Sequence, residues 1–325
     1  MYSQKMRNGS GYISVCIVIS VMTGASELLS ESEIIFPEIA ALATGMLAVP
    51  KQSWRADRKR MIVMIAAAAV AGTLLEKVSA AASLPVWGAV AVAYAAGQLL
   101  FFASKTDFVP VISAAAMPVI LRTDSWIYPI SAVSMTVFVS LMQKSLERAG
   151  LREEKKFTPL PPADAEDMAK AAVRILCVAA VAAVAAAAGY RFCIAPPLLV
   201  VFTEMMRKKF ADPGERKKHG VRTVALIFLC AFAGAASREI LTEKTGLPMT
   251  LSALSAIVLV MIFMALFRLR FPPAAALAVL PMIIAEDQLM SYPFQVCAGA
   301  AVFTAAAFLL NGIFVKITDR RSETS

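Results

Sequence analysis

The sequence predicts an all-α, polytopic membrane protein, and two observations indicate this fold class. Apolar residues fill 59% of the 325 positions, charged residues only 17%, and the mean hydropathy is +0.69. Soluble domains average closer to half apolar and a quarter charged. The apolar residues also come in repeated blocks of roughly 14 to 22 residues, which suits membrane helices. The composition therefore excludes a soluble enzyme, a disordered chain and a collagen-like fibre.

Twelve apolar segments are expected along the chain. They lie at about 13–29, 35–50, 61–76, 86–103, 108–121, 128–145, 171–190, 193–206, 223–238, 249–267, 271–284 and 292–315. The four shortest begin at or near a proline: 35–50, 108–121, 193–206 and 271–284. Proline suits the first turn of a helix, but pieces this short do not cross a bilayer core of about 30 Å unaided. We therefore expect broken or re-entrant helices buried among longer ones.

Lysine and arginine are unevenly distributed between the two sides of the predicted bundle. With the N-terminus in the cytoplasm and the segments alternating, 27 of the 32 cations fall on the cytoplasmic side. The five on the outer side are Lys77, Arg122, Arg191, Arg238 and Lys244. This asymmetry indicates a multi-pass protein of the plasma membrane with both termini in the cytoplasm.

The two halves of the chain resemble each other. Three residues recur 159 positions later: Pro37, Thr44 and Met46 as Pro196, Thr203 and Met205. Six recur 163 positions later, with Arg for Lys: Pro85, Lys105, Phe108, Pro110, Pro118 and Asp124 as Pro248, Arg268, Phe271, Pro273, Pro281 and Asp287. Such a period indicates an internal duplication.

The duplication defines the expected domains. A first membrane repeat covers 1–145, a cytoplasmic linker covers 146–170, and a second membrane repeat covers 171–325. Each repeat holds six segments, an even number, so both enter the membrane the same way up. We therefore expect two tandem parallel repeats, some of whose segments are short or broken, related by an axis near the membrane normal.

Catalytic and metal-binding patterns are missing from the sequence. There is no Walker motif and no Ser/His/Asp set, and the only histidine, His219, lies in a basic run. The five cysteines lie inside apolar blocks at spacings that fit no metal site. The cations lie between apolar blocks, which favours an orientation signal over a nucleic-acid partner. We therefore expect no enzyme, no metal and no cofactor.

The candidate anion site lies where each copy places a cation about one turn before a short, proline-led segment. Its residues are Lys105, Phe108 and Pro110 in the first copy, and Arg268, Phe271, Pro272 and Pro273 in the second. Free N–H groups at a helix start carry partial positive charge, which a nearby cation reinforces. We expect Lys105 and Arg268 to face each other and attract an anion. The alternative is that both cations only anchor cytoplasmic helix ends.

Three polar residues are expected to line the substrate path. Gln98 lies in the middle of its segment, where an uncharged polar side chain either joins helices or lines a path. Thr44 and Thr203 occupy equivalent positions in the two short segments. A path between the repeats near mid-depth would pass these short segments.

Two carboxylates, Glu38 and Glu204, are candidates for proton coupling. Glu38 follows Pro37 and has no acidic counterpart in the second copy, so its site would be asymmetric. The alternatives are that Glu38 is solvated at the outer edge and that Glu204 pairs with Arg207 at helical spacing.

The stretch Leu269–Leu280 reads Leu-Arg-Phe-Pro-Pro-Ala-Ala-Ala-Leu-Ala-Val-Leu and resembles the signature of the HPP family of integral membrane proteins. In that family a His-Pro-Pro tripeptide precedes small residues, whereas this chain has Phe271 at the histidine position. The resemblance makes nitrite transport a candidate function. The six-segment halves also resemble the membrane domains of fusaric-acid and aromatic-acid exporters, which implies organic anions as substrates.

These features predict a secondary transporter or channel for a small anion, either nitrite-like or organic, across the plasma membrane. One alternative is a non-transporting membrane subunit or docking partner that binds a soluble protein on the basic linker. Another is an aromatic or organic acid exporter. The expected partners are the anionic solute and the lipid bilayer, and a homo-oligomer is compatible with the sequence.

The orientation can be tested by labelling single cysteines in a variant whose native cysteines are replaced. We expect Lys155→Cys, in the linker, to resist a membrane-impermeant maleimide in intact cells, because positive-inside orientation places it in the cytoplasm. Lys244→Cys, on the outer side, should label. Rapid external labelling of Lys155→Cys would contradict the predicted topology.

Overall fold

A computed structural model describes residues 2–49, 53–154, 157–207 and 213–323. The expected segment end at 50, labelling position 155 and the ends of the expected domains at 1 and 325 lie outside these residues. The described residues form helices, turns and bends, without strands. Seven of the described helices are long and apolar enough to cross a membrane. The predicted all-helical class is therefore confirmed, and it includes seven candidate membrane-spanning helices.

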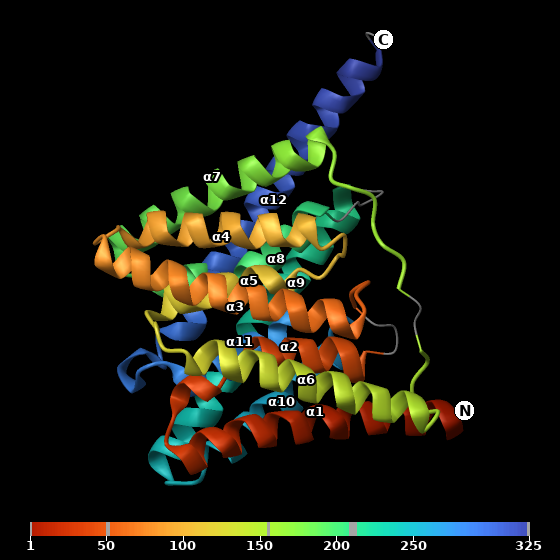
Figure 1. Cartoon of the computed structure of the whole chain (residues 1–325), viewed down its shortest axis with the longest axis vertical. Helices are drawn as coiled ribbons and strands as arrows, with labels where there is room; N and C mark the ends of the chain where they lie inside the picture. Colours follow the sequence, from red (N-terminus) through yellow and green to blue (C-terminus); the bar gives the residue numbers. More distant parts are fainter. Residues whose placement is uncertain (1, 50–52, 155–156, 208–212, 324–325) are drawn as a thin grey trace.

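Eight long helices surround four short ones (Figure 1). The long helices are α1 (Tyr2–Leu29), α3 (Arg58–Ala81), α4 (Val86–Ala103), α6 (Ile127–Arg148), α7 (Ala165–Ala188), α9 (Pro213–Ser237), α10 (Met249–Leu266) and α12 (Tyr292–Glu323). The short helices are α2 (Glu38–Ala43), α5 (Pro110–Leu121), α8 (Pro196–Arg207) and α11 (Pro273–Val279). Irregular helical turns extend two short helices and one long helix: Thr44–Ala48 after α2, Leu280–Ile283 after α11 and Arg238–Lys244 after α9.

Each of the twelve expected segments overlaps one of these helices, and the four expected short segments overlap the four short helices. The boundaries differ most where a helix continues into polar sequence. Helix α7 begins at Ala165, inside the expected linker 146–170, because the Asp164 side chain accepts a hydrogen bond from the Asp167 backbone and caps the helix. The polar connection between α6 and α7 is correspondingly shorter.

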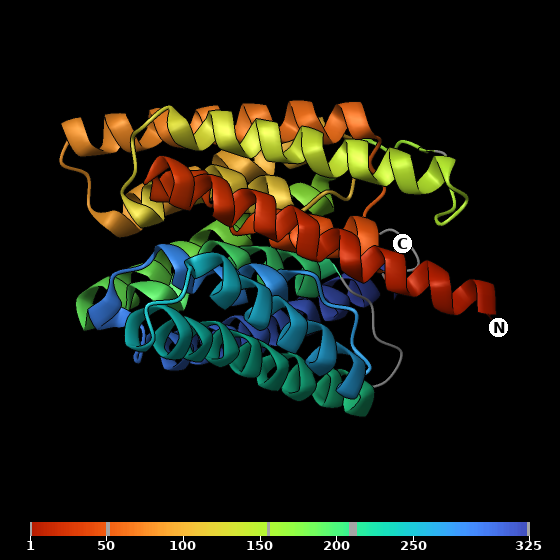
Figure 2. The same cartoon turned by 90° about the horizontal axis from the view of Figure 1, so that it is seen from below.

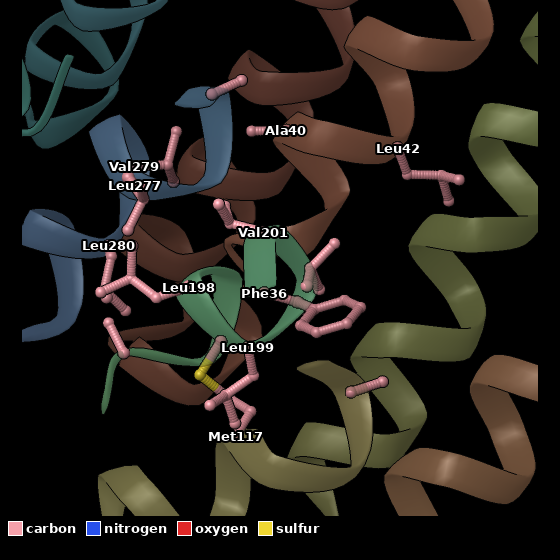
Figure 3. Packing of buried hydrophobic residues seen from close by; sticks show 14 of the residues in the cluster. Phe36, Ala40, Leu42, Met117, Leu198, Leu199, Val201, Leu277, Val279 and Leu280 are labelled. Atoms are coloured by element: carbon pink, nitrogen blue, oxygen red, sulfur yellow. The ribbon is translucent and has the colours of Figure 1, made fainter. Parts of the chain in front are cut away.

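The four short helices form the centre of the molecule. Every residue of α2 and α11 is buried, as are nearly all residues of α5 and α8. Helix α2 packs on α11, and α5 packs on α8. Figure 3 shows side chains from all four meeting, with Ala40, Met117, Leu198 and Leu277 among them. Because the long helices enclose them, backbone groups at their ends do not face lipid.

Proline and left-handed residues explain how the short helices begin. Pro110, Pro196 and Pro273 are the first residues of α5, α8 and α11, where a missing N–H costs no helical hydrogen bond. Two residues after the ends of α4 and α10, which precede α5 and α11, the chain has a residue with positive φ, 50° at Lys105 and 51° at Arg268. The chain thus turns sharply at both places before the proline-led helix begins.

The two halves of the chain lie against each other. Figure 2 shows most first-half helices above those of the second half, with α1 and α10 at their boundary. Two long-helix pairs join the halves, α1 with α10 and α4 with α7. The N-terminus, the C-terminus and the connection between α6 and α7 lie at the same end of the bundle (Figure 1).

Two glycines allow the long helices to approach the short ones closely. A Cβ at Gly72 of α3 would lie 2.4 Å from the Ala115 carbonyl oxygen of α5. A Cβ at Gly234 of α9 would lie 2.1 Å from the Ala278 carbonyl oxygen of α11. Both crossings therefore place helix backbone against helix backbone, as small residues permit in membrane proteins.

We expect Gly72→Ala and Gly234→Ala to lower the apparent Tm of the purified chain in detergent, because backbone must move to admit the methyl group. Overpacking of this kind costs about 1–3 kcal/mol. Gly312→Ala is the control, since nothing lies within 4 Å of its built Cβ. Equal Tm values for all three variants would contradict the close packing.

Candidate functional site

Four buried polar residues meet where α4, α7 and α8 join the two halves. We call Tyr94, Gln98, Arg174 and Thr203 the Arg174 cluster. Their side chains are at most 2% exposed. Tyr94 and Gln98 come from α4, Arg174 from α7 and Thr203 from α8. Two of the predicted lining residues, Gln98 and Thr203, are therefore brought together.

Hydrogen bonds connect the cluster across the boundary between the halves. The hydroxyl oxygens of Tyr94 and Thr203 lie 2.7 Å apart, and Gln98 Nε2 donates to Thr203 Oγ1 over 3.3 Å. Thr203 Oγ1 in turn donates to the Leu199 carbonyl over 2.9 Å. Arg174 Nη2 donates to Gln98 Oε1 over 2.8 Å. Gln98 therefore links the guanidinium to the two hydroxyls.

Helical spacing places these side chains together. Tyr94 and Gln98 are four residues apart on α4 and so share one face. Gln98 and Thr203 lie five and four residues from the C-terminal ends of their helices, about 8 and 6 Å along the axes. Arg174 lies nine residues into α7, about 14 Å from its start. The cluster is therefore well inside the helical bundle.

The positive charge of Arg174 is not paired with a carboxylate. Among the ion pairs of the described residues, none involves Arg174, and its Nε has no hydrogen-bond partner there. Arg207 adds a second positive charge to its surroundings and Asp167 a negative one. An arginine at the centre of a membrane helix costs at least about 2.5–3.5 kcal/mol on insertion scales. Its partners in the closed cluster are the neutral side chains of Gln98 and Tyr94.

Such an arrangement can bind a small anion. A guanidinium presents a fork of N–H donors that matches a two-oxygen anion such as a carboxylate. The hydroxyl of Tyr94 supplies a further donor within the same cluster. An anion that displaced the Gln98 oxygen would give Arg174 a charged partner. The cluster is closed in this conformation, so access requires the halves to move.

A second buried polar contact joins α2 and α5. Glu38 is 2% exposed, and one of its oxygens accepts a hydrogen bond from the fully buried Ser113 hydroxyl. Its other oxygen, Oε2, has no partner within the described residues. The alternative that Glu38 is solvated at the outer edge is therefore wrong: the short helix α2 carries it into the interior.

Glu204 has a different environment from Glu38. Its Oε1 accepts a hydrogen bond of 3.1 Å from the indole nitrogen of Trp54, which is 3% exposed. This contact joins the connection before α3 to α8 in the other half. Arg207, the partner considered from sequence, stacks on the Phe101 ring at 4.9 Å.

Lys105 and Arg268 are not brought together. Lys105 is exposed beyond α4, and its carbonyl accepts a hydrogen bond of 2.8 Å from the Leu160 backbone. Arg268 follows α10, on the other side of the short helices (Figure 1). The expectation that the two cations face each other is therefore wrong, because α4 packs on α7 and α10 packs on α1.

The aromatic and proline residues after these cations serve packing. Phe108 is 1% exposed and meets the Trp54 ring edge-on at 5.7 Å. Pro110 and Pro273 begin α5 and α11 and are buried, and Pro272 directly precedes α11. Phe271 packs, partly buried, against the hydrophobic core. These contacts position the short helices.

Arg268 and Thr44 do share a pocket. It has a volume of about 290 Å³ and lies between α1, the turn after α2, and the end of α10. Arg268 and Arg270 line it together with Thr44, whose hydroxyl has no partner within the described residues. Two sequence-predicted residues, from different halves, therefore meet at a second boundary.

Sequence reasoning missed Tyr94 and Arg174. Arg174 was counted with the cytoplasmic cations, although it lies inside an apolar stretch that runs from Ala171 to Ala188. A single arginine inside such a stretch is the signal that could have identified it. Tyr94 gives no comparable signal, because interfacial and buried tyrosines look alike in sequence.

Comparisons with known proteins identify no homologue that could assign a function to this geometry. No family model, curated protein or solved structure matches the chain. Among the described residues, no three His, Cys, Asp or Glu side chains lie together in a way that could hold a metal ion. The assignment of function therefore depends on the buried polar residues.

We expect Thr203→Val to destabilise the chain, because the Tyr94 hydroxyl and the Gln98 amide lose their shared partner. A buried donor left without a partner costs about 1–3 kcal/mol. Thr73→Val is the matched control, since the buried Thr73 hydroxyl has no partner within the described residues. Thermal unfolding in detergent measures both. A larger loss for Thr73→Val would contradict the hydrogen-bonding account.

Proposed function

We propose that this protein is a secondary transporter or channel for a small anion, and that the Arg174 cluster binds the anion. The observation that carries the proposal is the buried guanidinium of Arg174, which hydrogen-bonds the neutral Gln98 and forms no ion pair within the described residues. Retaining an unpaired cation at this depth is costly unless function requires it. A nitrite-like ion or small carboxylate has the two oxygens that a guanidinium binds.

We propose further that the halves are tandem parallel repeats. Equivalent contacts support this: Tyr128 donates to the Ala114 carbonyl over 2.8 Å, and Tyr292 donates to the Leu277 carbonyl over 2.6 Å. Each tyrosine ring also meets a phenylalanine edge-on, Phe36 at 5.4 Å and Phe192 at 5.2 Å. The tyrosines are separated by 164 positions and their carbonyl partners by 163, close to the sequence period, whereas the phenylalanines are separated by 156. The anion would then bind at the boundary between repeats.

Glu38 is the proposed proton-coupling group. Its carboxyl is buried between short helices of the centre, with one oxygen free of hydrogen bonds within the described residues. An ionisable group inside the membrane region is a functional candidate in its own right. Movement of α2 relative to α5 would change its contact with Ser113 and thereby its access to protons.

The orientation follows from charge. The basic segments lie at the end of the bundle that holds both termini and the α6–α7 connection. We propose that the bundle lies in the plasma membrane and that this end faces the cytoplasm. Gln98, Arg174 and Thr203 lie nearer this end than the outer end. A solute that arrives from the cytoplasm would therefore reach the cluster through the shorter path.

Uptake of nitrite and of acetate by proteoliposomes tests the proposal. We expect Arg174→Gln to reduce uptake at least tenfold, because the only charged donor of the cluster is lost. Arg174→Lys should restore part of the rate, since it keeps the charge but not the guanidinium fork. Arg148→Gln, an exposed arginine at the end of α6, is the matched control and should transport normally.

Full uptake by a folded Arg174→Gln variant would refute the role of the cluster. A wild-type chain that moves neither anion would instead favour a non-transporting membrane subunit. Sedimentation and Tm of each purified variant separate loss of function from loss of fold.

A further inference from the structure

The boundary between α1 and α10 contains an open apolar groove. Its volume is about 670 Å³, and its walls include Ile13, Ile17 and Val21 of α1 and Val258 and Ile262 of α10. All five side chains are at least 42% exposed, so the groove opens on the lateral surface of the bundle. Among the described residues that line it, none carries a charge.

One end of this groove runs into the polar pocket that holds Arg268 and Arg270. Tyr12, Met261 and Ala265 line both the groove and the pocket, so the two are continuous. Both arginines are exposed, and none of the described residues lining the pocket is a carboxylate. The combined site thus has an apolar body and a cationic end.

A buried hydroxyl without a partner faces the same end. Thr44 is 1% exposed and lines the polar pocket, and its Oγ1 makes no hydrogen bond within the described residues. Its counterpart in the other half, Thr203, is hydrogen-bonded to Tyr94 and Gln98. The position equivalent to Gln98 is Met261, 163 residues later, so the α1–α10 boundary lacks the group that would satisfy Thr44.

We propose that an anionic phospholipid of the cytoplasmic leaflet binds here. Its phosphate lies between Arg268 and Arg270 and accepts a hydrogen bond from Thr44, and one acyl chain lies in the groove. The groove extends from Leu254 to Ala265 on α10, about 16 Å at 1.5 Å per residue. This length is close to the roughly 15 Å of one hydrocarbon leaflet.

The chemistry of the site favours a lipid over other occupants. A free anion would use the cationic end but leave the apolar groove empty. A second copy of the chain would cover the groove but bring no anion to the arginines. Only an amphipathic anion matches both ends, and basic pockets between helices on the cytoplasmic side recognise such headgroups. The site is separate from the Arg174 cluster: it rests on the proposed orientation of the bundle but not on anion transport.

Lipid retention by the purified full-length chain tests the proposal. The chain is incubated in mild detergent with equal amounts of phosphatidylglycerol and phosphatidylcholine, and bound lipid is counted by native mass spectrometry. We expect one phosphatidylglycerol per chain, retained at least tenfold over phosphatidylcholine. Arg268→Gln combined with Arg270→Gln should remove this preference, and Ala265→Phe, at the junction, should weaken binding at least tenfold.

Two matched controls isolate the site. Lys105→Gln removes a cation from the equivalent end of α4, and Ala236→Phe fills a second apolar groove, between α9 and α10, whose described lining residues include no cation. Both should bind phosphatidylglycerol as wild type does. The varied residues 105, 265, 268 and 270 are exposed, so those variants should fold.

Three results would overturn the proposal. One is equal retention of both lipids, which indicates unspecific annular binding. Another is inorganic phosphate that competes with the lipid equally well in wild type and Ala265→Phe, which indicates a free-anion site. The third is a lipid-free dimer that dissociates in Ala265→Phe, which indicates that a second copy covers the groove.

Discussion

The architecture depends on one constraint: four helices too short to cross a bilayer must still bury all their backbone groups. Lipid cannot accept the unpaired N–H and C=O groups at their ends, so α2, α5, α8 and α11 lie at the centre, enclosed by the long helices. Glycines at 72 and 234 let the long helices reach them backbone to backbone. The proline-led starts and the left-handed residues at 105 and 268 follow from the same need, because the chain must reverse within a few residues.

The same constraint creates the two boundaries between the halves at which the proposed binding sites lie. The short helices of one half pack on those of the other, so α4 meets α7 on one side and α1 meets α10 on the other. The first boundary is filled by the Arg174 cluster, and the second opens into an apolar groove with a cationic end. One arrangement therefore yields a closed polar cluster, where we propose that an anion binds, and an open groove, where we propose that a lipid binds.

Much of the fold could be predicted from the sequence, because hydrophobic blocks and prolines report local structure. The range 86–103 matches α4 to the residue, and all four short helices were expected. The site was less predictable, since it depends on which helices meet. The repeat suggested that Lys105 faces Arg268, but helices equivalent by sequence need not touch. Arg174 was counted with the cytoplasmic cations because its depth depends on where α7 begins, and the Asp164 cap sets that point.

The guanidinium of Arg174 is the group that we propose binds an anion between the halves. Bromide is a small anion whose anomalous scattering locates it directly, so crystals of the chain grown with bromide test the claim. We expect an anomalous peak within hydrogen-bonding distance of Arg174 and near Gln98, Tyr94 and Thr203, and its loss in Arg174→Gln. Bromide bound only at surface cations such as Arg268, with the cluster unchanged, would contradict the account.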